Sequence, residues 1–313
     1  MGDHGKEEDN VPELSYLFKS TKLPDAHSRY ADARYVIFGV PFDGTSSFRR
    51  GSRLGPESVR YAYDNLESFD PYYGVNFPDV PITDLGNLEV GEDAAEVVDS
   101  VQQATSKIIL DGKVPIMIGG EHSITTGAIR NLRDVSMIII DAHSDFRESY
   151  MGNEHNHACV TRRSLEILGE GRIFSIGTRS VSKEEYDSPE FHKVRFFSAS
   201  MVRERGISSV IREIRNAVHG KIYISIDMDG IDPAYAPGVG TPEPYGLSDT
   251  DVKAVINTFA MDAVGFDILE FTPLYDNGNT SMLAAKLIQD FIGSRESRES
   301  RSYSADFWNQ KQR

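Results

Sequence analysis

Residues 136–145 read Ser-Met-Ile-Ile-Ile-Asp-Ala-His-Ser-Asp, an apolar run that ends in acidic residues and a histidine. A short run of Ile and Met is typical of a buried strand in a parallel sheet. Asp141, His143 and Asp145 follow at two-residue steps, which place side chains on the same side of an extended segment. The stretch therefore predicts an α/β fold in which three ligand-capable groups share one face at a strand end.

Three further stretches carry the same residue types. Gly-Gly-Glu-His occupies 119–122, Asp-Met-Asp-Gly-Ile-Asp occupies 227–232, and Glu270 stands alone in Leu-Glu-Phe-Thr-Pro. Three of the four stretches follow a run of Val, Ile and Met. Because open α/β sheets bind ligands outside the carboxyl ends of their strands, these side chains are expected to converge at one sheet edge. The pattern is typical of a metal site.

The same alternation of short apolar runs and helical patterns continues through the body of the chain, which favours one doubly wound α/β domain. Helical periodicity over Asp93–Leu110 predicts an amphipathic helix, and Ser248 with Asp251 resembles a capping box that begins another. Eight strands are predicted, at Tyr35–Val40, Pro81–Leu85, Pro115–Ile118, Ser136–Asp141, Ile173–Gly177, Val194–Ser198, Ile222–Asp227 and Ala263–Leu269.

The two ends of the chain differ from this body. Residues 1–30 lack sustained periodicity and are expected to form an N-terminal extension, followed by a single domain over 31–292. Residues 293–313 are expected to form a polar C-terminal tail, because their Ser-Arg-Glu repeat cannot bury a core. The only tryptophan, Trp308, lies in that tail, where it indicates either a contact with the body or another subunit, or an ordinary frayed terminus.

The amino-acid composition narrows the choice of binding partners and of cellular compartment. The chain has 313 residues with 48 acidic and 33 basic side chains, a formal net charge of −15. This charge disfavours nucleic acid and anionic membranes as partners and favours a small cation. The single cysteine, Cys159, permits no internal disulfide. Together with the absence of a signal-peptide pattern or a bilayer-spanning run, it predicts a cytoplasmic protein.

Four carboxylates and two imidazoles make up the candidate metal ligands: His122, Asp141, His143, Asp145, Asp227 and Asp229. Aspartates at strand ends can instead cap helices, but several carboxylates buried side by side are costly without positive charge. An oxygen-rich set suits a hard ion such as Mn²⁺ better than structural zinc. Six groups are too many for one ion with an open position, so we infer two metals, roughly 3.5–4 Å apart as in other two-metal hydrolases.

Charge counting indicates a cationic substrate. Two divalent ions, four aspartates and a bridging hydroxide leave the predicted site near −1. Glu270 adds a further negative group, which could accept a bidentate hydrogen bond from a planar guanidinium. The alternative role for Glu270 is a surface salt bridge.

These motifs resemble those of the ureohydrolase family, which comprises arginases, agmatinases and their relatives. Gly-Gly-Glu-His-Ser, Asp-Ala-His-Ser-Asp and Ser-Ile-Asp-Met-Asp-Gly-Ile-Asp-Pro stand in the family's order, and the resemblance covers nearly the whole chain. Further similarity lies in 39–45, 53–56 and 237–244. The resemblance implies a three-layer α/β/α sandwich with a mostly parallel eight-stranded, arginase-like sheet. It also implies two Mn²⁺ ions per chain and a homo-oligomer, often a trimer or hexamer.

The resemblance also implies individual roles. One ion would be held by His122, Asp141, Asp145 and Asp227, and the other by Asp141, His143, Asp227 and Asp229. His157 matches the family's acid/base histidine, Asp145 would direct the bridging hydroxide that attacks the substrate, and Glu270 would orient the guanidinium. The pKa of an ordinary histidine suits proton delivery near neutral pH. His155 is a weaker candidate than His157, and Cys159 is expected to be a small residue at the site rather than a nucleophile.

The loop over 146–156 is expected to read the substrate's far end, with Asn153 and Asn156 as candidate binding residues. It resembles the agmatinase branch, which predicts hydrolysis of agmatine to putrescine and urea. Asn156 and Tyr245 depart from the pattern of that branch. Three alternatives stay open: another ureohydrolase acting on arginine or guanidinobutyrate, an amide-cleaving deacetylase of related fold, and a non-catalytic binding scaffold.

Overall fold

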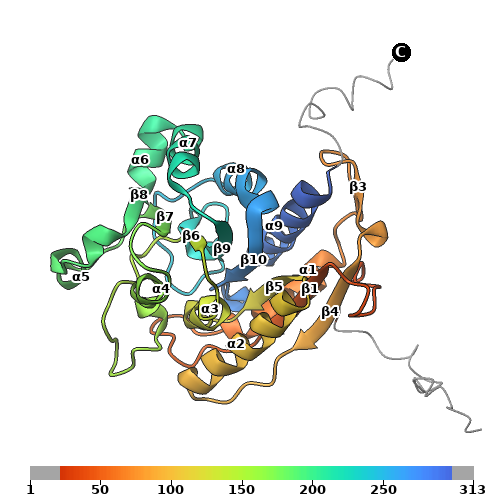
Figure 1. Ribbon diagram of the computed structural model, residues 1–313, viewed down its shortest axis with the longest axis horizontal. Coiled ribbons are helices and arrows are strands. Elements are labelled where there is room, and N and C mark those ends of the chain that lie inside the picture. The colour runs from red at the N-terminus through yellow and green to blue at the C-terminus, as the bar shows by residue number, and fades with distance from the viewer. Residues whose placement is uncertain (1–21, 298–313) are drawn as a thin grey trace, which may run out of the picture.

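An eight-stranded sheet runs through the middle of the computed structural model, which describes residues 22–297 (Figure 1). The strand order is β4-β1-β5-β10-β9-β6-β7-β8, and every neighbouring pair is parallel. The strands are β1 (Tyr35–Val40), β4 (Ile82–Asn87), β5 (Val114–Gly119), β6 (Val135–Ile140), β7 (Ile173–Thr178), β8 (Arg195–Ser198), β9 (Lys221–Asp227) and β10 (Ala263–Leu269). A separate hairpin pairs β2 (Phe69–Asp70) with β3 (Val75–Asn76). The predicted parallel fold is confirmed.

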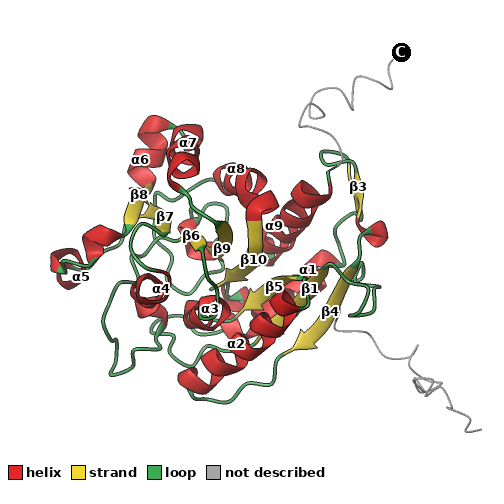
Figure 2. Ribbon diagram, in the orientation of Figure 1, coloured by secondary structure: helices red, strands yellow, loops and turns green. Residues whose placement is uncertain are grey.

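Helices cover both faces of this sheet (Figure 2). One layer comprises α1 (Gly55–Tyr63), α6 (Ala199–Arg205), α7 (Ile207–Ala217), α8 (Asp249–Phe259) and α9 (Asn279–Glu296). The other comprises α2 (Ala94–Leu110), α3 (Thr125–Ile129) and α4 (Val160–Leu168). The short helix α5 (Lys183–Asp187) lies between β7 and β8 in the chain.

Alternation along the strands explains why two helix layers are needed. In β6, Ile138 and Ile140 pack into the core beneath the first layer, whereas Met137 and Ile139 pack into the core beneath the second. Successive strand side chains point to opposite faces, so an apolar run without polar interruptions must be buried on both. The run in 136–140 therefore dictates a three-layer arrangement.

Side chains at the helix starts satisfy the free backbone N–H groups there. Asp93 caps α2 by accepting from the N–H groups of Ala95 and Glu96. Ser248 and Asp251 form the predicted capping box of α8, each side chain bonded to the other's backbone N–H. Both helices were expected from the sequence at these positions.

The sheet order brings the four acidic motifs together. Strands β5, β10, β9 and β6 are consecutive neighbours, and their carboxyl ends lead into residues 119–122, Glu270, 227–232 and 141–145 respectively. Strands β9 and β10 thus lie between β5 and β6, although they come much later in the chain. This strand reversal creates the kind of crevice in which α/β sheets bind ligands.

The described ends of the chain contact the body. Leu23, within the predicted extension, is buried, and its backbone N–H donates to Asp84 at 2.9 Å. At the other end, α9 continues past the expected boundary at 292 to Glu296. Trp308 lies outside the described residues. Over residues 22–297, no helix combines the length and apolar character that crossing a bilayer requires.

Candidate metal centre

Six histidine and aspartate side chains meet at the carboxyl edge of the sheet. They form two groups, within each of which the potential ligand atoms lie within 4.8 Å of one another. The first group is His122, Asp141, Asp145 and Asp227. The second is Asp141, His143 and Asp229. The structure thus brings together every residue that the sequence predicted as a ligand.

Distances in the first group converge on one nitrogen. His122 Nδ1 lies 3.3 Å from Asp141 Oδ2, 3.5 Å from Asp145 Oδ2 and 3.3 Å from Asp227 Oδ2. The opposite ring nitrogen, Nε2, lies 3.0 Å from the buried Ser225 hydroxyl. If that hydroxyl accepts from Nε2–H, the Nδ1 lone pair faces the three carboxylates, as a metal ligand requires.

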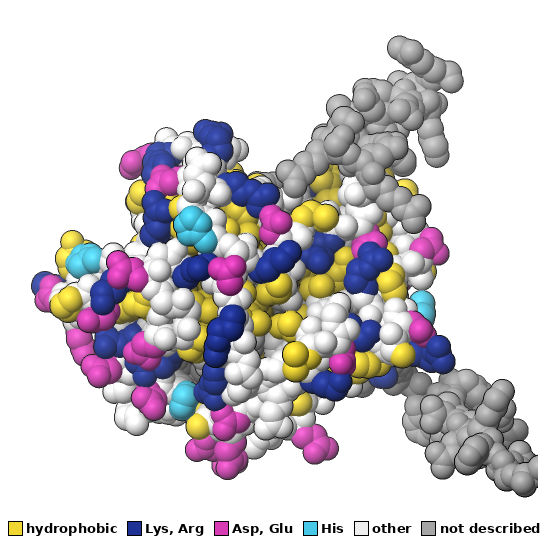
Figure 3. All heavy atoms as spheres, in the orientation of Figure 1, with side chains coloured by type: hydrophobic (Ala, Val, Ile, Leu, Met, Phe, Trp, Pro, Cys, Tyr) yellow, Lys and Arg dark blue, Asp and Glu magenta, His cyan; other side chains and the backbone are white. Residues whose placement is uncertain are grey.

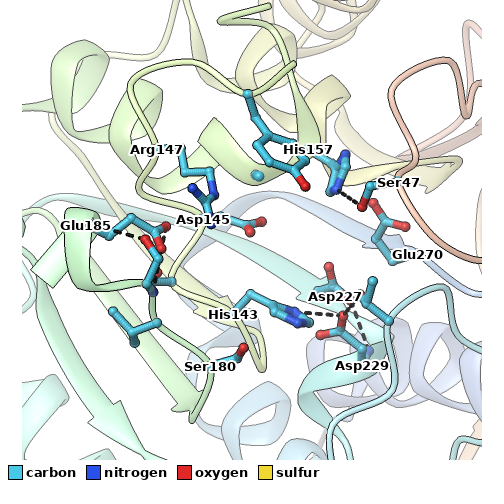
Figure 4. Close-up of a pocket in the computed structure, with 16 residues that line it drawn as sticks. Ser47, His143, Asp145, Arg147, His157, Ser180, Glu185, Asp227, Asp229 and Glu270 are labelled. Carbon is cyan, nitrogen blue, oxygen red and sulfur yellow. Dashed lines mark hydrogen bonds and ion pairs between the residues drawn. The ribbon is translucent and has the colours of Figure 1, made fainter. Parts of the chain in front are cut away.

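The second group is organised by backbone hydrogen bonds. The N–H of His143 donates to Asp141 Oδ1 at 2.6 Å, and the N–H of Asp229 donates to Asp227 Oδ1 at 2.9 Å. The His143 ring places Nδ1 3.1 Å from Asp229 Oδ2 (Figure 4). One oxygen of Asp141 and one of Asp227 are therefore fixed by the turn, and the other faces His122.

Two buried atoms in this cluster have no hydrogen-bond partner: His122 Nδ1 and Asp141 Oδ2. Buried polar atoms are nearly always satisfied, so an orphaned acceptor pair at the centre of four carboxylates points to a missing cation. The donor set of imidazole nitrogens and carboxylate oxygens is chemically suited to divalent ions. The residues present therefore fit the metal that the sequence predicts.

The pKa values in the cluster reflect the crowding of buried negative charges. Burial, with the charge of Asp145, raises the pKa of Asp141 to about 7. Burial and the neighbouring Asp229 and Asp141 likewise raise the pKa of Asp227 well above its usual range. Burial alone would lower the pKa of His143, but Asp229 outweighs it and raises that pKa to about 11. Without metal the cluster retains protons, which divalent cations would displace.

Two site residues adopt a left-handed backbone that non-glycine residues rarely take. Asp145 has φ 46° and Glu270 has φ 61°. Such conformations cost about 1–3 kcal/mol each and concentrate at functional sites. The neighbouring turn is equally constrained, because a Cβ on Gly120 would lie 2.1 Å from the carbonyl oxygen of Phe42. The sheet edge is held in one shape by packing.

Glu270 stands beside this cluster rather than in it. Its Oε1 accepts from the backbone N–H of His122 at 2.7 Å. Burial and the charges of Glu121 and Asp229 raise the pKa of Glu270 well above its usual range. A bound cation would favour its ionised form. Glu270 thus places a carboxylate beside the candidate ligands, and its role in orienting a guanidinium stays a prediction.

A pocket of about 220 Å³ opens onto the cluster. In Figure 4, Glu270 lies at one end, Arg147 and Glu185 at the other, and Asp227, Asp229 and His143 along one side. The remaining lining comes from several loops: Ser47, Ser144, Asp145, Tyr150, His157, Ala158, Ser180, Val181, Ser182 and Thr241.

His157 faces this pocket from the loop before α4. Its Nε2 lies 3.3 Å from Ser47 Oγ, and the Tyr150 ring meets its edge with centroids 6.1 Å apart. Burial lowers the pKa of His157, even though the nearby Asp145 acts in the opposite direction. The imidazole is thus neutral at neutral pH and can accept a proton.

The structure does not bring the two predicted asparagines to the pocket. Asn153 Oδ1 accepts from the N–H of His155, and Asn156 Oδ1 accepts from the N–H of Ala158. Neither is among the residues that line the pocket, and short-range hydrogen bonds use their side-chain oxygens to shape the loop. Their role in substrate binding stays a prediction. Tyr150 and Arg147 line the pocket from this loop instead.

Cys159 and His155 also lie away from the chemistry. Cys159 is fully buried and outside the pocket lining, and burial raises the pKa of its thiol to about 11. A protonated, inaccessible thiol is inert, which agrees with the expectation that it is no nucleophile. His155 lines a different cavity, beside Arg130 and Arg163.

Arg179, which the sequence analysis overlooked, ties two segments of the site together. Its guanidinium donates to the carbonyl oxygens of the Asp229 turn and to those of the loop after Thr241. The acceptors are the carbonyls of Gly177, Asp229, Gly230, Ile231, Glu243 and Pro244, at 2.7–3.5 Å. Thr241 in turn donates to Asp229 Oδ2 at 2.9 Å. Arg179 directly follows β7, which ends at this edge of the sheet. That position in the sequence could have indicated that its side chain lies near the site.

Replacing Arg179 with methionine is therefore expected to lower the free energy of unfolding by roughly 2–4 kcal/mol, because buried carbonyls lose their shared donor. Thermal denaturation followed by circular dichroism measures the change. Arg203 offers a matched control, since it is exposed and donates to one carbonyl of the same loop, that of Tyr245. Arg203→Met should change stability by less than about 0.5 kcal/mol; equal losses in both variants would contradict the role of Arg179.

Negative charge is concentrated in the site rather than on the surface seen in Figure 3. On that face, Lys and Arg side chains are interspersed with Asp and Glu. In the pocket, by contrast, Asp145, Asp227, Asp229 and Glu270 stand together.

A parallel sheet between two helix layers, with six histidine and aspartate side chains gathered at its carboxyl edge, defines an α/β/α protein with a candidate metal centre. The model of the Arginase family matches residues 33–293, and the chain belongs to that family. The resemblance inferred from the sequence motifs is thereby confirmed.

Three individual relatives have names more specific than that of the family. An N(1)-aminopropylagmatine ureohydrolase from Thermococcus kodakarensis is 35% identical over 287 residues, which cover 90% of this chain and 98% of the relative. An agmatinase from Pyrococcus horikoshii is 35% identical over 286 residues, with the same coverages of 90% and 98%. The crystal structure of an agmatine ureohydrolase from Thermoplasma volcanium matches with a TM-score of 0.89 and 58% identity, over 91% of this chain and 97% of that one. These relatives support ureohydrolase activity.

Proposed function

We propose that the protein hydrolyses the guanidino group of agmatine to urea and putrescine and uses two Mn²⁺ ions. The observation that carries the proposal is the gathering of Asp145, Asp227, Asp229 and Glu270 around one small pocket. A guanidinium is a planar cation whose N–H groups match carboxylate oxygens. The relatives named agmatinase and agmatine ureohydrolase support the same substrate.

The guanidinium end of the substrate is placed beside Glu270. Because Glu270 Oε1 already accepts from the His122 N–H, Oε2 is left to accept from the substrate. The strained backbone of Glu270 fixes the direction of that carboxylate. Binding holds the guanidinium carbon over the aspartate cluster, so the reaction begins from an oriented complex.

The two ligand groups would each hold one ion, with Asp141 common to both groups. The family resemblance implies that Asp227 would also serve both ions. When bound, two such ions lower the pKa of a water molecule and make a nucleophile available near neutral pH. The oxygen-rich donor set favours manganese over structural zinc. The manganese, the homo-oligomer and the cytoplasmic location inferred from the sequence stay predictions.

Two side chains of the protein then orient the water and transfer the proton. Asp145 holds the attacking water through its carboxylate and directs it at the guanidinium carbon. The carbon–nitrogen bond to the alkyl chain breaks, and urea forms as the amine leaves. His157, neutral before reaction, accepts a proton and passes it from Nε2 to the leaving nitrogen.

The alkyl tail points toward the outer end of the pocket. Tyr150, Ser180 and Ser182 line the pocket, and their hydroxyl oxygens can accept hydrogen bonds from a terminal ammonium. Arg147 lines it as well, its guanidinium 4.9 Å from the Tyr150 ring centroid and 3.7 Å from Glu184. A cationic side chain in this position favours a second candidate, a guanidino acid whose carboxylate would pair with Arg147.

Urea release from a panel of guanidino compounds decides between these substrates. The panel comprises agmatine, aminopropylagmatine, 4-guanidinobutyrate and arginine, each assayed with the Mn²⁺-loaded protein. We expect kcat/KM to be highest for agmatine. A clear preference for guanidinobutyrate that disappears in Arg147→Gln would assign the second candidate, and no urea from any compound would contradict the proposed activity.

A further inference from the structure

We propose that Thr45 and Glu121 are positioning residues that fix the tautomer and direction of His157. This inference rests on the proposed acid/base role of His157. Neither Thr45 nor Glu121 lines the pocket, and neither belongs to the ligand groups. Their hydrogen bonds nevertheless connect a buried carboxylate to the histidine ring.

The Glu121 side chain is fully buried and makes hydrogen bonds only as an acceptor. Its Oε1 accepts from the Thr45 hydroxyl and from the Ser123 hydroxyl, each at 2.6 Å. Its Oε2 accepts from the backbone N–H of Thr45 at 2.7 Å. The carboxylate therefore holds both the main chain and the side chain of Thr45.

The Thr45 hydroxyl transmits this constraint to His157. A hydroxyl has one hydrogen to donate, and Thr45 donates it to Glu121. Its oxygen must then accept from its remaining neighbours, which are the backbone N–H of His157 at 3.1 Å and the ring Nδ1 at 3.1 Å. Nδ1 consequently carries the hydrogen, and neutral His157 keeps its lone pair on Nε2.

The tautomer matters because the two ring nitrogens face different surroundings. Nδ1 points to Thr45, away from the substrate, whereas Nε2 lies 3.3 Å from Ser47 Oγ at the pocket. With the hydrogen on Nδ1, Nε2 is the atom that accepts and returns a proton at the reacting end. The opposite tautomer would present a hydrogen where a lone pair is needed.

Hydrogen bonds between the surrounding turns hold Glu121 and Thr45 in position beside His157. The backbone N–H of Gly120 donates to the Val40 carbonyl at 3.0 Å, and that of Glu121 donates to the Phe42 carbonyl at 2.8 Å. The loop after β1 is thus fastened to the turn after β5. Thr45 cannot turn away from His157 without breaking its own two hydrogen bonds to Glu121.

Kinetics of Thr45 variants test the proposal. Thr45→Val keeps the shape of the side chain but removes the acceptor, and we expect kcat with agmatine to fall about 10- to 100-fold with little change in KM. Thr45→Ser restores the hydroxyl and should recover most of kcat. Ser123→Ala removes the other donor to Glu121 Oε1 and is the matched control. An unchanged kcat in Thr45→Val, or an equal loss in Ser123→Ala, would overturn the proposal.

A spectroscopic measurement keeps this test separate from the proposed activity. Nitrogen-15 NMR of the full-length chain, labelled at histidine and loaded with diamagnetic Mg²⁺, reports which ring nitrogen is protonated. The His157 signal is assigned by its loss in His157→Asn. We expect the hydrogen to be on Nδ1 in the wild type and to shift toward Nε2 in Thr45→Val. A wild-type protein with the hydrogen on Nε2 would refute the proposed role of Thr45 and Glu121. Unchanged turnover in His157→Asn would instead refute the acid/base role.

Discussion

Replacing Asp227 with asparagine is expected to lower kcat for urea release by about 10⁴-fold, the scale seen when one member of a catalytic unit is removed. Asp227 is central to the cluster: Oδ1 fixes the Asp229 turn, and Oδ2 lies 3.3 Å from His122 Nδ1. Asparagine keeps the shape but replaces one oxygen with an amide NH₂. That group cannot bind a cation, so one shared ligand is lost.

Turnover and metal content should both be measured for this variant. We expect fewer bound ions per chain by elemental analysis, together with the loss of turnover. Asp262→Asn provides a matched control, because Asp262 is a half-buried aspartate that pairs with Arg215 and is not part of the pocket lining. It should behave like the wild type. Full turnover in Asp227→Asn with the normal metal content would disprove the assignment of Asp227 as a ligand.

Removal of the metal with a chelator is expected to abolish urea release and to lower the thermal midpoint by roughly 10 °C. An ion present at a thousand times its Kd stabilises the folded state by about 4 kcal/mol, and each kcal/mol shifts the midpoint of a chain this large by about 2–4 °C. Chelation also leaves Asp141, Asp145, Asp227 and Asp229 buried together, with only retained protons to compensate their charge. Differential scanning calorimetry measures the shift.

Adding metals back distinguishes a functional centre from a structural one. We expect Mn²⁺ to restore both the thermal midpoint and turnover, and Zn²⁺ or Mg²⁺ to restore turnover less well. Size-exclusion chromatography of the metal-free chain checks that aggregation is not the cause of the loss. A thermal midpoint that stays unchanged after complete metal removal would contradict the metal centre inferred from His122 and its carboxylate neighbours.

The strands could be predicted from the sequence because each is a short apolar run with clear polar ends. The runs at 35–40 and 263–269 match the observed β1 and β10, and the other six strands agree to within two residues at either end. The strand order could not be read in the same way. It depends on how helices pack across both faces, which no local pattern encodes. The short helix α3 was also missed, since five residues carry little periodicity.

The ligands were predictable because motif spacing and strand ends together place them. Asp141, His143 and Asp145 needed only the two-residue period of an extended segment. The residues around them come from distant loops, such as Thr45 after β1 and Arg179 after β7. Their contacts depend on backbone carbonyls and ring nitrogens, which leave no residue-type signature. Asn153 had the right chemistry for binding, but a local hydrogen bond uses its carbonyl oxygen.

The insertion of β9 and β10 between β5 and β6 means that the candidate metal centre can assemble only after the last strand of the sheet has been made. A nascent chain that has emerged only to residue 200 already contains His122 and the ligands of 141–145, but nothing separates β5 from β6. Asp227 and Asp229 arrive with β9, and Glu270 only with β10. A product truncated at residue 200 would therefore expose the edges of β5 and β6 and lack three of the acidic side chains that line the pocket or its cluster.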